Sequence, residues 1–126
     1  MVWLRHGTTL MRAKRIMEIG PQLPYEESPS SYGDDLGFSL VLKGMRSYLG
    51  EPEEYAHGKA RLFADEGGPA VLEVDVPQRI INCSDVEYAP PSQGIVVFDW
   101  QHGLCELLDV WSGLNKRIIK LKEARE

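Results

Sequence analysis

Apolar residues recur along this chain at two different spacings, which predict strands and helices in turn. Residues 69–77 are the clearest strand, because apolar side chains occupy every second position and share one face, and the apolar run RIIN could extend this strand beyond Pro77. Residues 95–98 (IVVF) form an unbroken apolar run, which indicates a buried strand. Shorter apolar runs predict strands at three further places: 2–5, 37–42 and 116–121.

Three segments instead repeat their apolar residues at intervals of three and four, as helices do. The first follows Thr8 or Thr9, either of which can cap a helix, and it ends at Gly20. The other two cover residues 53–65 and 104–111. Because strands and helices alternate irregularly, the order favours an α+β fold over a doubly wound sheet. The strands at 2–5, 37–42, 69–76 and 95–98 should meet around one cleft.

The chain has 126 residues, which fits a single domain spanning 1–126. Its net charge of −5 argues against broad nucleic-acid binding, which needs a basic face. Two cysteines form no disulfide framework, so we expect a reducing, cytoplasmic environment. No apolar run approaches the length of a membrane span, so no membrane partner is expected.

Conventional catalytic and metal-binding motifs are scarce in this sequence. The histidine and cysteine of H-x-x-C, His102 and Cys105, have no further ligands nearby in sequence, and we predict no metal site. There is no P-loop and no G-x-G-x-x-G. Residues 21–35 contain three prolines and three serines and should form a mobile lid.

The opening of the chain is more informative, because His6 and Gly7 stand where the first strand gives way to a helix. A glycine lets a ligand approach the backbone, and free N–H groups at a helix start favour an anion such as a pyrophosphate. Arg5 and Arg12 would add charge-assisted contacts. The alternative is that His6 only bonds a nearby carbonyl.

Several motifs occur in the order found in one known family. HGTT followed by RAKRIMEIG resembles the first motif of the ADP-ribosyltransferase fold, in the branch of the poly(ADP-ribose) polymerases and diphtheria-toxin-like enzymes. GFSL resembles the family's next strand, and EEYAHGKARLFADEGGPAVLEVDVP resembles its following helix and strand. The resemblance spans most of residues 2–98 and implies a split, bent β-sheet with flanking helices.

The resemblance also implies a role for each matching residue. His6 would hydrogen-bond an NAD ribose hydroxyl, the backbone of Gly7 would hold the nicotinamide carboxamide, and Tyr55 would stack on the nicotinamide ring. Arg5, Thr8 and Ser39 complete the expected NAD-binding residues. Tyr55 could equally pack on the core as an ordinary helix residue.

The sequence departs from the family pattern at two positions. Ser39 replaces a tyrosine, and Gln93 stands where the family has the glutamate that stabilises the cationic ribose. Glu87 or Glu106 could replace that carboxylate if a loop brings it near. His6, Gln93 and Glu87 are therefore the candidate catalytic residues.

We expect an NAD-binding ADP-ribosyltransferase-like protein that, if active, cleaves the nicotinamide–ribose bond. ADP-ribose would pass to a protein or nucleic-acid acceptor or to water. One alternative is an inactive nucleotide- or protein-binding module of the same fold. A second is an RNA 2′-phosphotransferase-like enzyme, although the net negative charge disfavours it.

Overall fold

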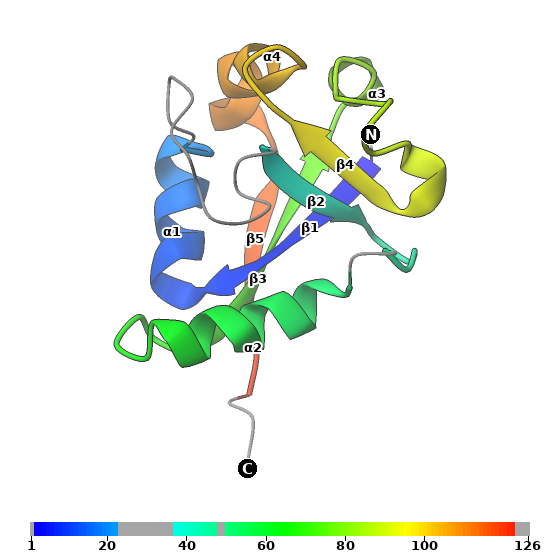
Figure 1. Ribbon diagram of the computed structural model, residues 1–126. Helices are drawn as coiled ribbons and strands as arrows, with labels where there is room; N and C mark the ends of the chain where they lie inside the picture. Colours follow the sequence, from blue (N-terminus) through cyan, green and yellow to red (C-terminus); the bar gives the residue numbers. More distant parts are fainter. Residues whose placement is uncertain (1, 23–36, 48–49, 123–126) are drawn as a thin grey trace.

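The computed structural model describes residues 2–22, 37–47 and 50–122, and Figure 1 shows their arrangement. Most of the expected lid, residues 21–35, therefore lies outside the described residues. The strands are β1 (Val2–Thr9), β2 (Phe38–Leu42), β3 (Pro69–Val76), β4 (Ile95–Phe98) and β5 (Lys116–Lys120). The α-helices are α1 (Leu10–Ile19), α2 (Pro52–Leu62), α3 (Gln78–Ile81) and α4 (Leu104–Val110). Short 3₁₀ helices cover Pro91–Gln93 and Trp111–Gly113.

The five strands form one sheet in the order β4-β2-β1-β3-β5, and every neighbouring pair is antiparallel. The helices lie around this sheet rather than between parallel strands, which confirms the α+β prediction (Figure 1). The strand β1 is central and longer than predicted, since it pairs with β3 from Val2–Val76 to Thr9–Pro69.

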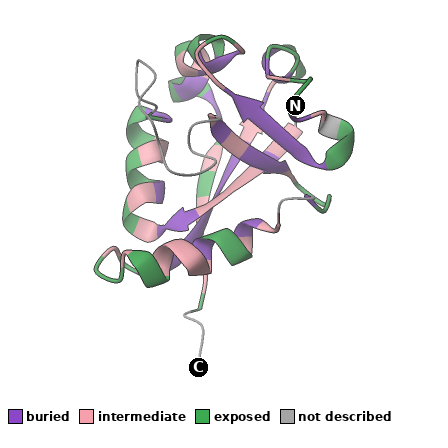
Figure 2. Ribbon diagram, in the orientation of Figure 1, coloured by how far each residue is buried: buried purple, intermediate pink, exposed green. Residues whose placement is uncertain are grey.

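The main core lies between one face of the sheet and the helices α1, α3 and α4. Alternate strand residues such as Leu4, Leu72 and Val74 are fully buried there, against Ala13 of α1 and Leu104 of α4. Figure 2 shows this burial running through the sheet while the outer faces of the helices stay exposed. The apolar alternation seen in the sequence thus faces these three helices.

The helix α2 packs on the opposite face of the sheet. A Cβ built on Gly7 of β1 would lie 1.9 Å from the carbonyl oxygen of Pro52 and 3.0 Å from the nitrogen of Ala56. Gly7 is three positions from Leu4 along the strand, so the two point to opposite faces. Gly7 therefore allows α2 to approach the backbone of β1.

The predicted extension of the strand beyond Pro77 is wrong. Residues 78–81 form the helix α3. In its first turn, the backbone N–H groups of Ile80 and Ile81 donate hydrogen bonds to the carbonyl of Pro77. Proline has no N–H with which to continue a ladder, and the turn buries both isoleucines in the core. Among the described helices, none is long and apolar enough to cross a membrane.

Candidate functional site

The strands β1 and β2 pair over only a short stretch and then separate. They pair through Leu4–Leu42 and Arg5–Val41, and Figure 1 shows them diverging from there. We call the diverging segments, residues 6–9 of β1 and 38–40 of β2, the β1–β2 split. His6 is the first residue of β1 beyond the last pair.

The His6 side chain joins the two sides of the β1–β2 split. Its Nδ1 lies 2.8 Å from the carbonyl oxygen of Ser39. Since a carbonyl oxygen can only accept a hydrogen bond, Nδ1 carries the proton and is the donor. The ring also lies against Phe38, with the ring centroids 4.6 Å apart. The carbonyl bond considered as the alternative for His6 is therefore present, and it fixes the orientation of the ring. In a neutral imidazole that donates from Nδ1, the second nitrogen, Nε2, is an acceptor.

The start of α1 is not available to an anion as predicted. The backbone N–H of Leu10 donates a hydrogen bond to the carbonyl of Gly68, and the backbone N–H of Met11 donates one to the carbonyl of Glu66. The hydroxyl of Thr9 caps the helix by accepting from the nitrogen of Arg12. The expectation of free N–H groups for a pyrophosphate is therefore wrong, because neighbouring backbone and the cap already bond them.

Glu66 also supplies the negative charge that a ligand would have brought to this helix end. Its Oε2 accepts hydrogen bonds from the Thr9 hydroxyl at 2.8 Å and from Nε of Arg12 at 2.7 Å. The hydrogen bonds from Arg12 and Thr9 lower the pKa of Glu66 below its usual 4.5. The guanidinium of Arg12 additionally lies 3.8 Å from the ring centroid of Phe63. Arg12 thus holds the turn before β3 against α1.

Arg5 is likewise engaged within the protein. One guanidinium nitrogen lies 2.7 Å from Oε1 of Glu53, and the other lies 3.6 Å from Oε2 of Glu51. These contacts join β1 to the start of α2. The two arginines expected to hold an anionic ligand are therefore both paired with carboxylates. Thr8, expected beside the ligand, is 3% exposed.

Tyr55 lies on α2, the helix that covers the face of the sheet opposite His6. Its side chain is 48% exposed, which disagrees with the alternative of a core-packing tyrosine. Its ring lies 3.4 Å from the position a Cβ would take on Gly50. The stacking role of Tyr55 stays a prediction.

Gln93 and Glu87 are the two candidates for the position of the family's catalytic carboxylate. They lie away from His6 and from each other. Gln93 is exposed beside Arg46 and Ser47, at the end of β4 that precedes Ile95. Ser39, the partner of His6, pairs with Val97, four residues further along. Since β2 also lies between β4 and β1, the backbone of Gln93 is two strand spacings, roughly 10 Å, or more from that of His6.

Glu87 belongs to a different part of the surface. It raises the pKa of His102, together with Asp99 and Asp85. The nitrogen of Asp85 bonds the carbonyl of Val97 on the outer edge of β4. Since β2 separates β4 from β1, two strand spacings, about 10 Å, lie between this edge and His6. Sequence reasoning paired His102 with Cys105 and missed Asp99, three residues before the histidine.

Comparison with known proteins gives no relative: no family model, no curated protein and no solved structure matches this chain.

Proposed function

We propose that this protein binds NAD at the β1–β2 split, as an ADP-ribosyltransferase-like module. The observation that carries the proposal is the place of His6, at the point where β1 and β2 separate. Its Nδ1 donates a hydrogen bond to the carbonyl of Ser39, which fixes the ring at this point, and a ribose hydroxyl of NAD would bind beside the ring. The order of motifs over residues 2–98 supplies the choice of NAD.

We further propose that the module binds NAD without cleaving it efficiently. Departure of nicotinamide leaves positive charge on the ribose, and a nearby carboxylate stabilises that charge. Gln93 precedes β4 and Glu87 lies near His102 beyond β4, and β2 separates β4 from β1, so the backbones of both residues are about 10 Å or more from that of His6. The inactive alternative therefore fits the geometry better than the active enzyme does.

The RNA 2′-phosphotransferase alternative is less well supported. Such an enzyme needs arginines directed at phosphate groups. Arg5 and Arg12 instead contact Glu53 and Glu66, and the net charge is −5.

Calorimetric titration with NAD tests the binding step, using two histidine variants. His6→Asn keeps an N–H near the position of Nδ1, and thus the bond to Ser39, but removes Nε2. We expect it to weaken NAD binding at least tenfold while the protein stays folded by circular dichroism. The matched control is His57→Asn on α2, which should bind like the wild type. Equal affinity of wild type and His6→Asn would overturn the proposed site.

Release of nicotinamide tests the catalytic step separately. We expect slow release from the wild type and no increase in Gln93→Glu, because the new carboxylate stands too far from His6. A carboxylate in the right position would accelerate cleavage roughly a hundred- to thousandfold. Acceleration of that size in Gln93→Glu would show that residue 93 reaches the ribose. It would refute the proposal that the module binds NAD without cleaving it efficiently.

A further inference from the structure

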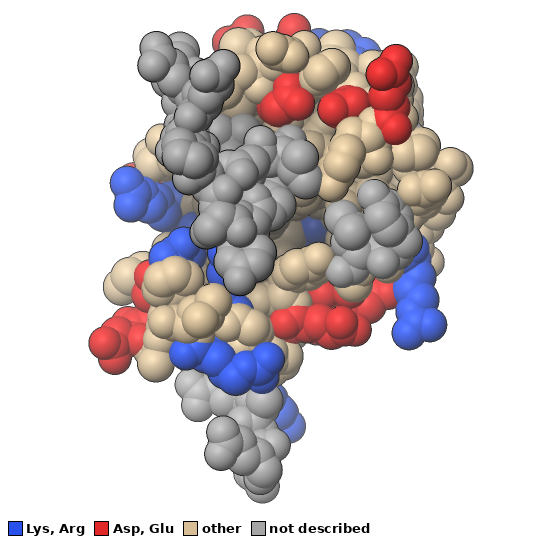
Figure 3. Space-filling model, viewed as in Figure 1, with Lys and Arg blue, Asp and Glu red and all other residues tan. Residues whose placement is uncertain are grey.

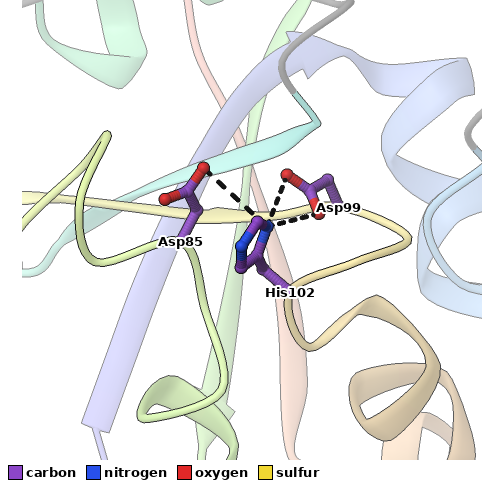
Figure 4. Close-up of side chains that lie close together, drawn as sticks. All are labelled: Asp85, Asp99 and His102. Carbon is purple, nitrogen blue, oxygen red and sulfur yellow. Dashed lines mark hydrogen bonds and ion pairs between the residues drawn. The ribbon is translucent and has the colours of Figure 1, made fainter.

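Two aspartates and a histidine meet at the end of β4, apart from the β1–β2 split. Figure 4 shows the side chains of Asp85 and Asp99 directed at the same nitrogen of His102. Nδ1 of His102 lies 2.8 Å and 3.1 Å from the two carboxylate oxygens of Asp99, and 3.9 Å from Oδ2 of Asp85. One ligand atom from each residue lies within 4.8 Å of the other two. We call these three residues the His102 cluster.

Backbone bonds fix the positions of both loops that supply the His102 cluster. Asp99 follows β4 directly and exchanges backbone hydrogen bonds with His102, at 3.2 Å and 3.0 Å. The nitrogen of Asp85 bonds the carbonyl of Val97 within β4. Both ligand-bearing segments are therefore attached to the same strand, and ordering them costs little further conformational entropy.

Each aspartate also has one oxygen held in place by a backbone N–H. Oδ1 of Asp99 accepts from the nitrogen of Gln101 at 2.8 Å, and Oδ1 of Asp85 accepts from the nitrogen of Tyr88 at 3.1 Å. Both oxygens of Asp99 still lie close to Nδ1 of His102, and Asp85 directs its other oxygen, Oδ2, at the same nitrogen. Acidic side chains gather on this part of the visible surface, over α3, β4 and α4 (Figure 3).

We propose that the His102 cluster binds one divalent transition-metal ion of the Zn²⁺ type through Asp85, Asp99 and His102. An imidazole nitrogen with carboxylate oxygens is a donor set that suits zinc. Ligand atoms about 2.1 Å from a tetrahedral ion are about 3.4 Å from one another. The distances of 2.8–3.9 Å from Nδ1 bracket that value, and all three ligand atoms lie within 4.8 Å of one another. Small side-chain rotations would bring them to the separations that an ion requires.

The site has three protein ligands and stays open to solvent. The side chains of Asp85, Asp99 and His102 are 20%, 27% and 42% exposed. Water therefore reaches the ion and takes the remaining position, as in zinc sites with three protein ligands. The charge of two carboxylates offsets that of the ion, and the nearby Glu87 adds to the negative potential.

A proton competes with the metal for Nδ1. The hydrogen bond with Asp99 raises the pKa of His102, partial burial opposes this, and the charges of Asp99, Asp85 and Glu87 add to it. A metal ion must displace that proton.

Calorimetric titration with Zn²⁺ alone tests the proposal. The exposed thiols of Cys83 and Cys105 are first replaced by serine, because thiolates also bind zinc. We expect saturable binding of one ion per chain.

Variants of the ligands then separate this site from general attraction of cations to an acidic surface. Asp85→Asn, Asp99→Asn and His102→Gln should each weaken Zn²⁺ binding at least tenfold. The controls Asp109→Asn, which removes an exposed carboxylate from α4, and His57→Gln should bind normally. Asp85→Asn leaves the close Asp99–His102 contact intact, so it remains a valid test if Asp99→Asn unfolds.

Selective line broadening by Mn²⁺ in NMR spectra gives an independent location. Signals of residues 85, 99 and 102 should broaden first, at low Mn²⁺ concentration. Absence of saturable Zn²⁺ binding, or equal affinity in wild type and the ligand variants, would overturn the proposal.

Discussion

Replacing Gly7 with alanine should destabilise the protein strongly. The added Cβ would lie 1.9 Å from the carbonyl oxygen of Pro52 and 2.8 Å from its carbon. Ordinary contacts between carbon and oxygen are about 3.3 Å or longer, so α2 would have to retreat by about 1.4 Å. Both neighbours are backbone atoms, which cannot move aside by a change of rotamer.

The magnitude follows from the packing between α2 and β1. Overpacking of a buried contact costs about 1–3 kcal/mol, and more where the backbone must shift. We expect a loss of about 3 kcal/mol or more for Gly7→Ala, a large share of the roughly 5–15 kcal/mol that stabilises a typical domain. In an open position, alanine would instead add about 0.4–1 kcal/mol by restricting the unfolded chain.

Gly58 of α2 provides the matched control. A Cβ built there has no neighbour within 4 Å, and alanine is favoured over glycine inside a helix by about 1 kcal/mol. Urea denaturation of wild type, Gly7→Ala and Gly58→Ala measures both effects, with the m-value as a check on two-state unfolding. If Gly7→Ala loses less than about 1 kcal/mol, close approach of α2 is not the reason for glycine at this position.

Three further predictions concern polar contacts. Thr9→Ala removes the cap of α1 and the bond to Glu66, and should cost about 1–2 kcal/mol in thermal or urea unfolding, whereas Thr9→Ser should cost less. Arg12 and Thr9 lower the pKa of Glu66, so its ion pair stabilises the fold above pH 4.5, and this stabilisation is lost as the pH falls through the lower folded pKa. The free energy of unfolding of Glu66→Gln should therefore differ from that of the wild type near pH 7 and converge with it in acid. The pKa of His102 is raised above 6.5, chiefly by its hydrogen bond with Asp99, so the Asp99–His102 pair stabilises the fold below pH 6.5 and this stabilisation is lost as the pH rises through the folded pKa. The free energies of unfolding of wild type and Asp99→Asn, measured against pH, should therefore converge at alkaline pH.

Most strands and helices could be predicted because each has a local signature. The alternation in 69–77 places its apolar side chains on the face that packs against α1, α3 and α4. Thr9 and Gly20 bound α1 as expected of a cap and a stop. The error after Pro77 arose because an apolar run as short as RIIN fits a buried helix turn as well as a strand.

The candidate sites could be predicted only in part, because their geometry depends on residues far apart in sequence. The histidine at the end of the first apolar run was identifiable, yet its partner Ser39 is 33 residues away. Glu66 occupies the start of α1 although it is more than 50 residues from Arg12. Asp99 and His102 form a local pair, but only the bond from Asp85 to Val97 brings the third ligand beside them.

The sequence by itself determined the α+β class and the order of the main elements, since these depend on local periodicity. Tertiary structure alone decided what surrounds the HGT motif. It separated β1 from β2 beyond Arg5, placed α2 against Gly7, and distributed Gln93 and Glu87 to different surfaces. These outcomes depend on strand register and helix packing, in which each position is fixed by many distant contacts at once.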